Sequence, residues 1–237
     1  MTETLPPVCI LAGGRGTRLG DRVVETPKPL LAVANRPFLH HQLELLKSHG
    51  AHRVVICVGY LGERIEASIG RGDGFGLDIR YAHDGPALAG TAGAVRNALP
   101  LLGERFLVLY GDTYLRIDYR EVAAELHRRG LPAIMTVLRN EGRWDTSNAE
   151  VDGGMVRHYD KRAPTPAMGW IDYGLAALTP AAFDAAPGAS DLADVYAALA
   201  LAGRLGAFEA RERFYEIGTP EALRETEAFL LKGAERT

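Results

Sequence analysis

The sequence predicts an α/β fold with a mixed, mainly parallel central sheet and a smaller β-rich region in its second half. Apolar runs of strand length alternate with segments of helical period through the first half of the 237-residue chain. Alternation of this kind is typical of parallel strands whose connecting helices cover both faces of one sheet. In the second half the apolar runs lie closer together, which favours added strands.

The first half alternates strands with helices. Apolar runs predict strands at residues 8–12, 53–58, 77–81 and 106–110. Apolar residues at helical spacing predict helices at residues 38–46, 61–69, 91–99 and 119–129. Gly50 is the expected stop of the first helix, since glycine is common just past a helix end.

The second half is richer in strands. Strands are expected at residues 133–138, 149–151, 155–159, 170–178 and 205–208, and helices at residues 190–202 and 220–232. The last helix has a clear start, with Thr219 as N-cap and Pro220 at its first position, and Gly233 as its stop. Because no Ser-, Pro- or Gly-rich linker and no internal repeat interrupts the chain, residues 1–237 are expected to form a single domain.

Composition and charge exclude several classes of protein. Hydrophobic residues make up 47% of the chain and charged residues 24%, with a formal net charge of −3, as in an ordinary globular domain. No stretch has more than two adjacent basic residues, so no nucleic-acid partner is expected. The 27 glycines exceed the roughly 7% that soluble proteins average, and this excess needs an explanation.

The cysteines and the N-terminus bear on the compartment. Cys9 and Cys57 both lie inside apolar runs, which predicts buried packing for each thiol. Residues 1–4 lack the basic and apolar regions of a signal peptide, and no apolar run approaches the roughly 18 residues that span a bilayer. We therefore expect a soluble, cytoplasmic protein without a membrane partner.

A glycine-rich loop follows the first expected strand. Residues 11–20 are Leu-Ala-Gly-Gly-Arg-Gly-Thr-Arg-Leu-Gly, and three glycines in four residues let the backbone turn with convergent N–H groups, which suits phosphate. The P-loop is excluded because no Lys and Ser/Thr follow the second glycine. The dinucleotide fingerprint is excluded because Leu19 stands where it needs glycine. Taken alone, the loop is also compatible with an ordinary turn.

Two charged residues are placed to act with that loop. Lys28 lies between two prolines that stiffen its backbone, and a lysine suits a single phosphate oxygen. Asp112 follows the apolar run 106–110 and Gly111. Since ligands of open α/β sheets bind beyond the carboxyl ends of the strands, Asp112 is a candidate to hold Mg²⁺ against the same phosphates. A turn or a helix cap is the alternative role for Asp112.

These segments together resemble the nucleoside-triphosphate sugar-1-phosphate nucleotidyltransferases. The resemblance rests on Gly13-Gly14-Arg15-Gly16-Thr17-Arg18-Leu19, on Thr26-Pro27-Lys28-Pro29-Leu30 and on Gly111-Asp112, and it continues to Glu216-Ile217-Gly218-Thr219-Pro220. It implies a Rossmann-like nucleotidyltransferase fold with an NTP-binding half, residues 1–130, and a sugar-phosphate-binding half, residues 131–237. It also implies that an NTP and a sugar 1-phosphate react to give an NDP-sugar and pyrophosphate, with Mg²⁺ as cofactor.

The resemblance implies a role for each matching residue. Arg18 would hold the departing pyrophosphate, Lys28 would neutralise the α-phosphate, and Lys161 would bind the sugar phosphate. Asp112 and Glu216 would ligate Mg²⁺. The nucleotide would be bound by Leu11, Ala12, Gly13, Gly14, Gly16, Thr17, Gly90 and Thr91. The sugar phosphate would be bound by Asn148, Asp160, Lys161 and Asp172.

Several residues depart from the family pattern on the sugar side. Glu216 stands where the family more often has aspartate, and Asp160-Lys161 replaces the familiar Glu-Lys pair. The glycine that usually lies near the sugar is replaced near Ser147-Asn148. Asp172 stands where many relatives have a small or amide residue, and both a sugar contact and a strand-end hydrogen bond are open for it. These changes leave the reaction type standing and put the particular sugar in doubt.

The resemblance favours a short, single-domain subgroup. Gly90-Thr91-Ala92-Gly93 resembles a segment of the heptose-1-phosphate and mannose-1-phosphate guanylyltransferases, and no C-terminal β-helix domain follows. We therefore expect GTP and a heptose or mannose 1-phosphate as substrates, in polysaccharide biosynthesis. Cytidylyl or uridylyl transfer to another sugar phosphate, a phosphorylated alcohol or a phosphonate is one alternative. A non-catalytic subunit that senses nucleotide sugars is another, and a homodimer is open.

Overall fold

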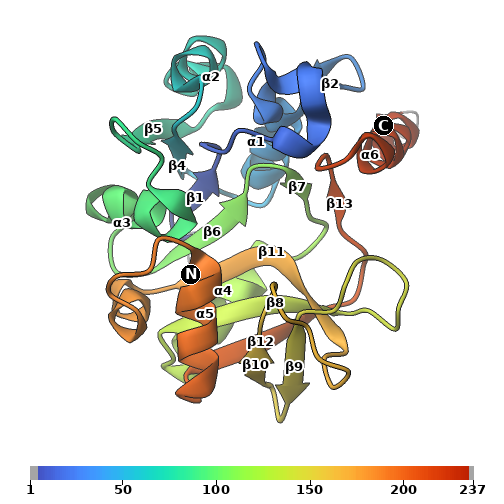
Figure 1. Cartoon of the computed structure of the whole chain (residues 1–237). Helices are drawn as coiled ribbons and strands as arrows, with labels where there is room; N and C mark the ends of the chain where they lie inside the picture. Colours follow the sequence, from blue (N-terminus) through green and yellow to red (C-terminus); the bar gives the residue numbers. More distant parts are fainter. Residues whose placement is uncertain (1–4, 235–237) are drawn as a thin grey trace.

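A nine-stranded mixed sheet runs through the centre of the described part of the molecule, in the order β5-β4-β1-β6-β11-β8-β12-β10-β9 (Figure 1). The computed structural model describes residues 5–234, and the side chains of Arg18, Asp21, Arg22 and Ala234 lie outside that description. The predicted α/β class and mixed central sheet are confirmed.

The central strands of this sheet, such as β1, β4 and β6, are short apolar segments. The strand bounds are β1 Val8–Leu11, β4 Arg53–Val58, β5 Asp78–His83, β6 Phe106–Tyr110, β8 Ala133–Arg139, β9 Ala149–Asp152, β10 Met155–Tyr159, β11 Trp170–Leu178 and β12 Leu205–Ala210. β5, β4, β1 and β6 pair in parallel, as do β8 and β12. β11 pairs antiparallel with both β6 and β8, so it joins the parallel half of the sheet to the strands added by the second half of the chain.

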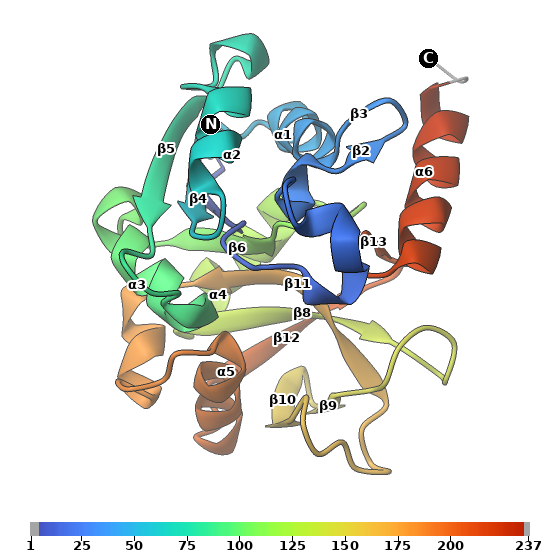
Figure 2. The same ribbon diagram turned by 45° about the horizontal axis from the view of Figure 1, so that its top comes forward.

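Helices cover both faces of the sheet (Figure 2). Their bounds are α1 Phe38–Ser48, α2 Gly62–Ile69, α3 Gly90–Leu102, α4 Tyr119–Arg129, α5 Leu192–Leu201 and α6 Pro220–Ala234, with the 3-10 turns η1 Thr17–Val23, η2 Lys28–Leu30, η3 Asp73–Phe75 and η4 Pro180–Ala185. Buried residues of α1, α2 and α4 pack on one face, and those of α3 and α5 pack on the other. None of these helices is long and apolar enough to cross a lipid bilayer within residues 5–234.

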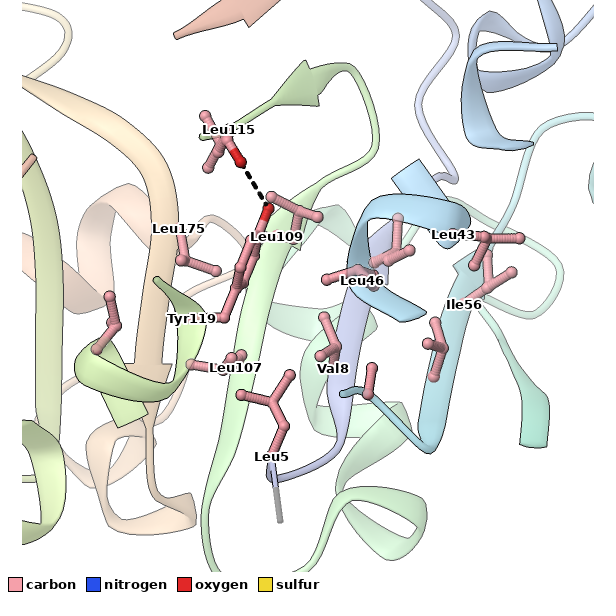
Figure 3. Close-up of a cluster of buried hydrophobic side chains, with 14 of the residues drawn as sticks. Leu5, Val8, Leu43, Leu46, Ile56, Leu107, Leu109, Leu115, Tyr119 and Leu175 are labelled. Atoms are coloured by element: carbon pink, nitrogen blue, oxygen red, sulfur yellow. Dashed lines mark hydrogen bonds between the residues drawn. The ribbon is translucent and has the colours of Figure 1, made fainter. Parts of the chain in front are cut away.

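Successive side chains of β1 point to opposite faces of the sheet and belong to two different hydrophobic cores. Val8 belongs to the core beneath α1 and α4, whereas Cys9 belongs to the core beneath α3 and α5. Figure 3 shows the first of these, where Val8 and Leu46 lie near one another and the Tyr119 hydroxyl donates to the Leu115 carbonyl at 3.3 Å. A strand buried on both faces is apolar along its whole length, which explains the continuous runs in the sequence. Both cysteines are buried, as predicted.

A third, smaller core joins the C-terminal helix to the segment that follows the glycine loop. It contains Leu19 and Val23 of η1 together with Ile217 and Leu223 near the start of α6. Two short ladders that the sequence did not predict lie beside it, β2 Ala32–Val33 with β3 Arg36–Pro37 and β7 Thr113–Tyr114 with β13 Tyr215–Glu216. The end of the chain thus braces the segments that lead to Lys28 and Asp112.

Substitution of Leu46 tests the first core. Leu46 is 0% exposed, so Leu46→Ala removes packed apolar volume and is expected to lower the free energy of unfolding by about 2–5 kcal/mol. The matched control is Leu201→Ala, because Leu201 is 90% exposed and its truncation should change stability by no more than about 0.5 kcal/mol. Urea unfolding followed by circular dichroism measures both, and equal losses would contradict the assignment of the core.

Candidate active site

The ends of β1 and β6 meet at one edge of the sheet. The Gly111 N–H donates to the Leu11 carbonyl at 2.9 Å, and a Cβ on Gly111 would lie 2.5 Å from that oxygen. Glycine is therefore needed at this position for the two strand ends to approach. The glycine loop leaves β1 at the same edge, held there by a hydrogen bond from the Tyr60 N–H to the Gly13 carbonyl at 3.1 Å.

A cavity of about 350 Å³, here called the loop cavity, opens where the glycine loop and Asp112 meet. It is lined by Leu11, Ala12, Gly13, Gly14, Gly16, Thr17, Lys28, Pro29, Asp84, Leu88, Gly90, Thr91, Ala94, Tyr110, Gly111, Asp112 and Gly218. The structure thus brings together the eight residues predicted to bind the nucleotide, although they come from the glycine loop and from the start of α3.

A second cavity of about 420 Å³, here called the lysine cavity, lies on the other side of Asp112. It is lined by Tyr110, Asp112, Thr113, Asp145, Thr146, Asn148, Lys161, Pro164, Ile171, Asp172, Tyr173, Gly174, Phe214 and Glu216. Tyr110 and Asp112 line both cavities, so the two spaces meet at the carboxyl end of β6.

Two predicted residues are not seen in these cavities. Asp160 lines neither, and its carboxylate instead accepts the N–H groups of Arg162 at 2.7 Å and Ala163 at 2.9 Å. The hydrogen bond from the Ala163 N–H is the main cause of a lowered Asp160 pKa, which marks a surface turn. Arg18 lies in η1 directly after Thr17, and its side chain falls outside the described residues. Its contact with pyrophosphate stays a prediction.

An ion pair joins Lys28 to Asp112 at the meeting point of the cavities. Lys28 Nζ donates to Asp112 Oδ2 at 2.6 Å, and the two side chains are 12% and 28% exposed. Lys28 begins η2, whose next residue is Pro29, so the prolines hold the lysine in a short turn. The other carboxylate oxygen of Asp112 accepts the Thr113 hydroxyl at 3.1 Å. Lys28 and Asp112, which lie 84 positions apart, therefore form one charged unit.

Gln42 braces the turn that carries Asp112. Its side chain is 1% exposed on α1, and its Nε2 donates to the carbonyls of Tyr110 at 3.0 Å and Thr113 at 2.7 Å. Those two carbonyls flank Asp112 in the chain, so the Gln42 amide holds the turn of residues 110–113 in place. The sequence gives no signal for this residue, because one glutamine in an amphipathic helix resembles any solvated polar residue.

Glu216 reaches the lysine cavity through the pairing of β13 with β7. Thr113 is its register partner, and the Ile217 N–H donates to the Asp112 carbonyl at 3.0 Å. Asp112 and Glu216 thus lie on neighbouring backbone segments and line the same cavity. Two carboxylates are a donor set that suits Mg²⁺, which usually completes its six ligands with water and substrate phosphate. No group of three or more metal-binding side chains occurs within residues 5–234.

Lys161 and Asp172 form a second ion pair. Lys161 Nζ lies 3.0 Å from Asp172 Oδ2 and 5.0 Å from the centre of the Tyr110 ring. Burial lowers the pKa of Lys161, but the Asp172 carboxylate more than offsets this and the net pKa is raised, so the ammonium stays charged. Burial also raises the pKa of Tyr110, which keeps its hydroxyl neutral beside the ammonium.

The start of α3 is tied to the start of α5. The Thr91 hydroxyl donates to the Asp191 carboxylate at 2.9 Å and accepts the Leu192 N–H at 2.8 Å. The Ala92 N–H donates to the Ser190 carbonyl at 2.8 Å, and a Cβ on Gly90 would collide with that carbonyl. Thr91 is therefore part of a structural junction on the wall of the loop cavity, and a contact with the nucleotide stays a prediction.

Asp84 is a cavity residue that is not predicted from the sequence. It follows β5 and lines the loop cavity near Gly13 and Gly59. Its Oδ1 is buried and has no hydrogen-bond partner among the described residues, and burial raises the Asp84 pKa. A buried carboxylate oxygen without a partner is costly, so a ligand that donates to it would be favoured. A lone aspartate in the segment His-Asp-Gly-Pro resembles an ordinary turn residue, which left no signal to find it.

A family model described as nucleotidyl transferase matches residues 8–148. This chain belongs to the nucleotidyl transferase family. The match contains the glycine loop, Lys28, Asp84 and Asp112, whereas Lys161, Asp172 and Glu216 lie beyond it.

Two relatives of this chain have names that differ in both the nucleotide and the sugar phosphate. N-acetylmuramate alpha-1-phosphate uridylyltransferase of Neisseria meningitidis is 42% identical over 111 residues, which cover 46% of this chain and 48% of that protein. The catalytic subunit beta of mannose-1-phosphate guanylyltransferase of Xenopus tropicalis is 28% identical over 220 residues, which cover 90% of this chain and 61% of that protein. The chain thus spans about half to three fifths of the length of these relatives.

Solved structures share the fold of the whole chain. A structure described as a glucose-1-phosphate thymidylyltransferase from Bacillus anthracis, in complex with a sucrose, superposes with a TM-score of 0.82 at 22% identity and covers 94% of both chains. HddC from Yersinia pseudotuberculosis, complexed with GMP-PN, superposes with a TM-score of 0.77 at 22% identity and covers 95% of this chain and 99% of its own. The fold predicted for the family is therefore confirmed over nearly the full length of this chain.

Substitution of Gln42 tests the brace beneath Asp112. Gln42→Leu keeps the apolar volume but leaves the Tyr110 and Thr113 carbonyls without their donor, so the free energy of unfolding should fall by about 1–3 kcal/mol. The control is Asn97→Leu, because the Asn97 amide also donates to a carbonyl, at 3.2 Å, but on an exposed helix face. Urea unfolding of both variants gives the comparison, and an unchanged midpoint for Gln42→Leu would contradict the brace.

Proposed function

We propose that this nucleotidyl transferase moves a nucleoside monophosphate from an NTP to a sugar 1-phosphate and releases pyrophosphate. One observation carries the proposal: Asp112 and Tyr110 line both cavities. A nucleotide in the loop cavity and a sugar phosphate in the lysine cavity would therefore meet at the Lys28–Asp112 pair. A protein that only senses nucleotide sugars would not need a charged pair at that junction.

The reaction needs charge neutralisation more than acid–base catalysis. An oxygen of the sugar phosphate bonds to the α-phosphorus, the bond from that phosphorus to the bridging oxygen breaks, and pyrophosphate leaves with the electron pair. A phosphate monoester has its second pKa near ~6, so the attacking oxygen is already anionic at pH 7. The described residues that line the two cavities include no histidine and no cysteine. Repulsion between two polyanions is the main barrier, and lysines reduce it.

The two lysines divide this work between them. Lys28 lies at the junction of the cavities, within reach of an α-phosphate in the loop cavity, and it is held in place by Asp112 at 2.6 Å. Lys161 lies in the lysine cavity and would bind the phosphate of the sugar. A site that holds both reactants in the correct orientation makes the bimolecular reaction effectively unimolecular, which accounts for a large part of catalysis in such sites.

Mg²⁺ fits the oxygen ligands that the site offers. Asp112 and Glu216 would hold the ion, with substrate phosphate and water completing its shell. When bound, Mg²⁺ supplies charge that stabilises the phosphate oxygens during transfer. Asp112 Oδ2 accepts Lys28 Nζ at 2.6 Å, so an ion held at that oxygen would compete with the ammonium, which would then be available to the nucleotide.

GTP is the nucleotide that the loop cavity supports best. Guanine presents two neighbouring N–H donors on its Watson–Crick edge, and a carboxylate accepts such a pair with both oxygens. The Asp84 carboxylate lines this cavity, where it accepts the Ala89 N–H and keeps a buried Oδ1 without a partner among the described residues. Leu88, which is 47% exposed, provides apolar surface for a base. Uracil has one N–H between two carbonyl groups and would meet the carboxylate less well. The mannose-1-phosphate guanylyltransferase of Xenopus tropicalis, which aligns with 90% of this chain, also favours GTP, and it favours mannose 1-phosphate as the acceptor.

Uridylyl transfer is the second candidate. It is favoured by the 42% identity to the N-acetylmuramate alpha-1-phosphate uridylyltransferase of Neisseria meningitidis. That identity extends over 111 residues, so it bears on less than half of this chain.

Pyrophosphate release tests the proposed reaction. The purified protein is incubated with Mg²⁺, one of GTP, UTP, CTP, dTTP or ATP, and a panel of sugar 1-phosphates that includes mannose, glucose and heptose. We expect release with at least one pair, highest with GTP. Asp112→Asn and Lys28→Ala should each lower kcat by about 10²–10³-fold, since each removes charge at the point of transfer.

The control variants make the same kinds of substitution at residues that line neither cavity. Asp152→Asn changes a 78% exposed carboxylate paired with Arg157, and Lys232→Ala changes an exposed lysine of α6. Both should retain wild-type rates. The absence of pyrophosphate with every pair would rule out the proposed activity, and near-normal rates for Asp112→Asn would rule out its role in holding Mg²⁺.

Base preference tests the role of Asp84. Asp84→Asn replaces one acceptor oxygen by a donor, which should lower kcat/KM for GTP by about 10–100-fold, the usual effect of losing one bidentate base contact. The kcat/KM for UTP should stay unchanged. Rates are compared for GTP and UTP at a fixed concentration of the best sugar phosphate, with Asp73→Asn of the exposed turn η3 as control. Equal losses for GTP and UTP would show that Asp84 does not read the base.

A further inference from the structure

The carboxylate of Asp172 is buried against the lysine of the second cavity. Its side chain is 4% exposed, and it accepts the Lys161 ammonium at 3.0 Å, the Tyr159 hydroxyl at 2.9 Å and the Gly174 N–H at 3.0 Å. An ionised carboxylate offers about four acceptor positions, and three are used here. Little acceptor capacity is left for the hydroxyl of a sugar.

We propose that Asp172 is a positioning residue that fixes the Lys161 ammonium at the wall of the lysine cavity, and that it does not bind the sugar itself. This inference rests on the proposed function, which assigns the sugar phosphate to Lys161. It replaces the direct sugar contact that the sequence suggested for Asp172 by an action through its neighbour.

The surroundings of Lys161 support a fixed ammonium. Its Nζ lies over the Tyr110 ring at 5.0 Å and the Tyr159 ring at 5.8 Å, and it is 3.5 Å from the Tyr110 hydroxyl. Aromatic faces attract a cation at these distances. A lysine otherwise loses several rotatable bonds of freedom when it binds a ligand, so an ammonium that is already held binds a phosphate at lower entropic cost. The side chain is still 39% exposed, which leaves ammonium protons available to the cavity.

Asn148 extends the same support to the backbone. Its Oδ1 accepts the Asp172 N–H at 2.9 Å, its own N–H donates to the Trp170 carbonyl at 2.8 Å, and its carbonyl accepts the Asp160 N–H at 3.0 Å. One residue thus joins the strand that carries Asp172 to the segment that carries Lys161. The side-chain oxygen of Asn148 is used by this link.

An amide could not replace the Asp172 carboxylate. Asparagine has one acceptor oxygen in place of two, and its NH₂ group would face either the Lys161 ammonium or the Gly174 N–H, which are both donors. The charge that compensates the ammonium would also be lost, and an ammonium without a counter-charge is disfavoured where it is partly buried. The aspartate at this position is therefore explained by Lys161 rather than by the sugar.

A double-mutant cycle tests the proposal. Asp172→Asn, Lys161→Ala and the double variant are assayed with the NTP and sugar phosphate that the wild-type chain uses. Each single change should lower kcat/KM for the sugar phosphate by about 10–100-fold, chiefly through KM, with KM for the NTP unchanged. The double variant should be no worse than Lys161→Ala, because Asp172 acts through that lysine. A double variant that shows the product of both single losses would overturn the proposal and indicate a sugar contact.

Two further variants keep the test independent of folding. Tyr159→Phe removes one donor to Asp172 at nearly constant volume, and it should raise KM for the sugar phosphate severalfold in the wild-type chain but not in the Lys161→Ala chain. Circular dichroism checks that each variant is folded. Asp152→Asn, a carboxylate-to-amide change on the exposed end of β9, is the control and should behave as wild type. Loss in Tyr159→Phe that persists without Lys161 would count against the proposal.

Failure of the proposed function can be distinguished from failure of this positioning role. In the first case the wild-type chain would release no pyrophosphate with any pair, and the cycle would be measured on binding of mannose 1-phosphate by calorimetry. The same non-additive loss of affinity in Asp172→Asn and Lys161→Ala would support the positioning role. Additive losses, or no binding to the wild-type chain, would overturn it.

Discussion

The site depends on one close approach, that of β1 to β6. Leu11 is the register partner of Tyr110, and the Gly111 N–H donates to the Leu11 carbonyl. Any side chain on Gly111 would collide with that carbonyl, so the approach requires glycine. Because parallel strands present their carboxyl ends at the same edge, the approach places the glycine loop beside Asp112. The loop cavity is the space that remains between them, and part of the glycine excess in the composition is explained by this contact.

Each lysine of the site is paired with an aspartate, but the two pairs differ in exposure. The Asp112 side chain is 28% exposed at the junction of the cavities, whereas that of Asp172 is 4% exposed behind Lys161. Under the proposed function the first pair can open, since a metal ion would compete with Lys28 for Asp112 and a phosphate would compete with Asp112 for Lys28. The second pair would stay closed, because the Asp172 carboxylate is nearly buried and already accepts three donors. Under the same proposal, Lys28 would be held until the nucleotide binds, and Lys161 would be held throughout.

Regular elements could be predicted from the sequence because their signals are local. The helix α4 was predicted with its observed bounds, as Asp118 caps its start by accepting the Arg120 N–H and Gly130 ends it in a left-handed conformation. The strand β6 was likewise a five-residue apolar run. The two-residue ladder of β7 with β13 has no periodicity to detect, and it depends on segments about 100 positions apart in the chain. Gln42 and Asp84 were missed for a related reason: their importance comes from burial, which one polar residue does not reveal.

The division of the chain between the two cavities explains why the family is clear and the sugar is not. The family match ends at residue 148, and of the residues that line the loop cavity only Gly218 lies beyond it. The lysine cavity takes Lys161, Asp172, Phe214, Glu216 and four more lining residues from the part of the chain after the match. That later part also returns to brace the first, through the Ile217 N–H on the Asp112 carbonyl and the Thr226 hydroxyl on the Glu216 carbonyl. Under the proposed function, the nucleotide would thus be bound almost entirely by the part of the chain within the family match, whereas most of the residues that would line the acceptor site lie beyond it.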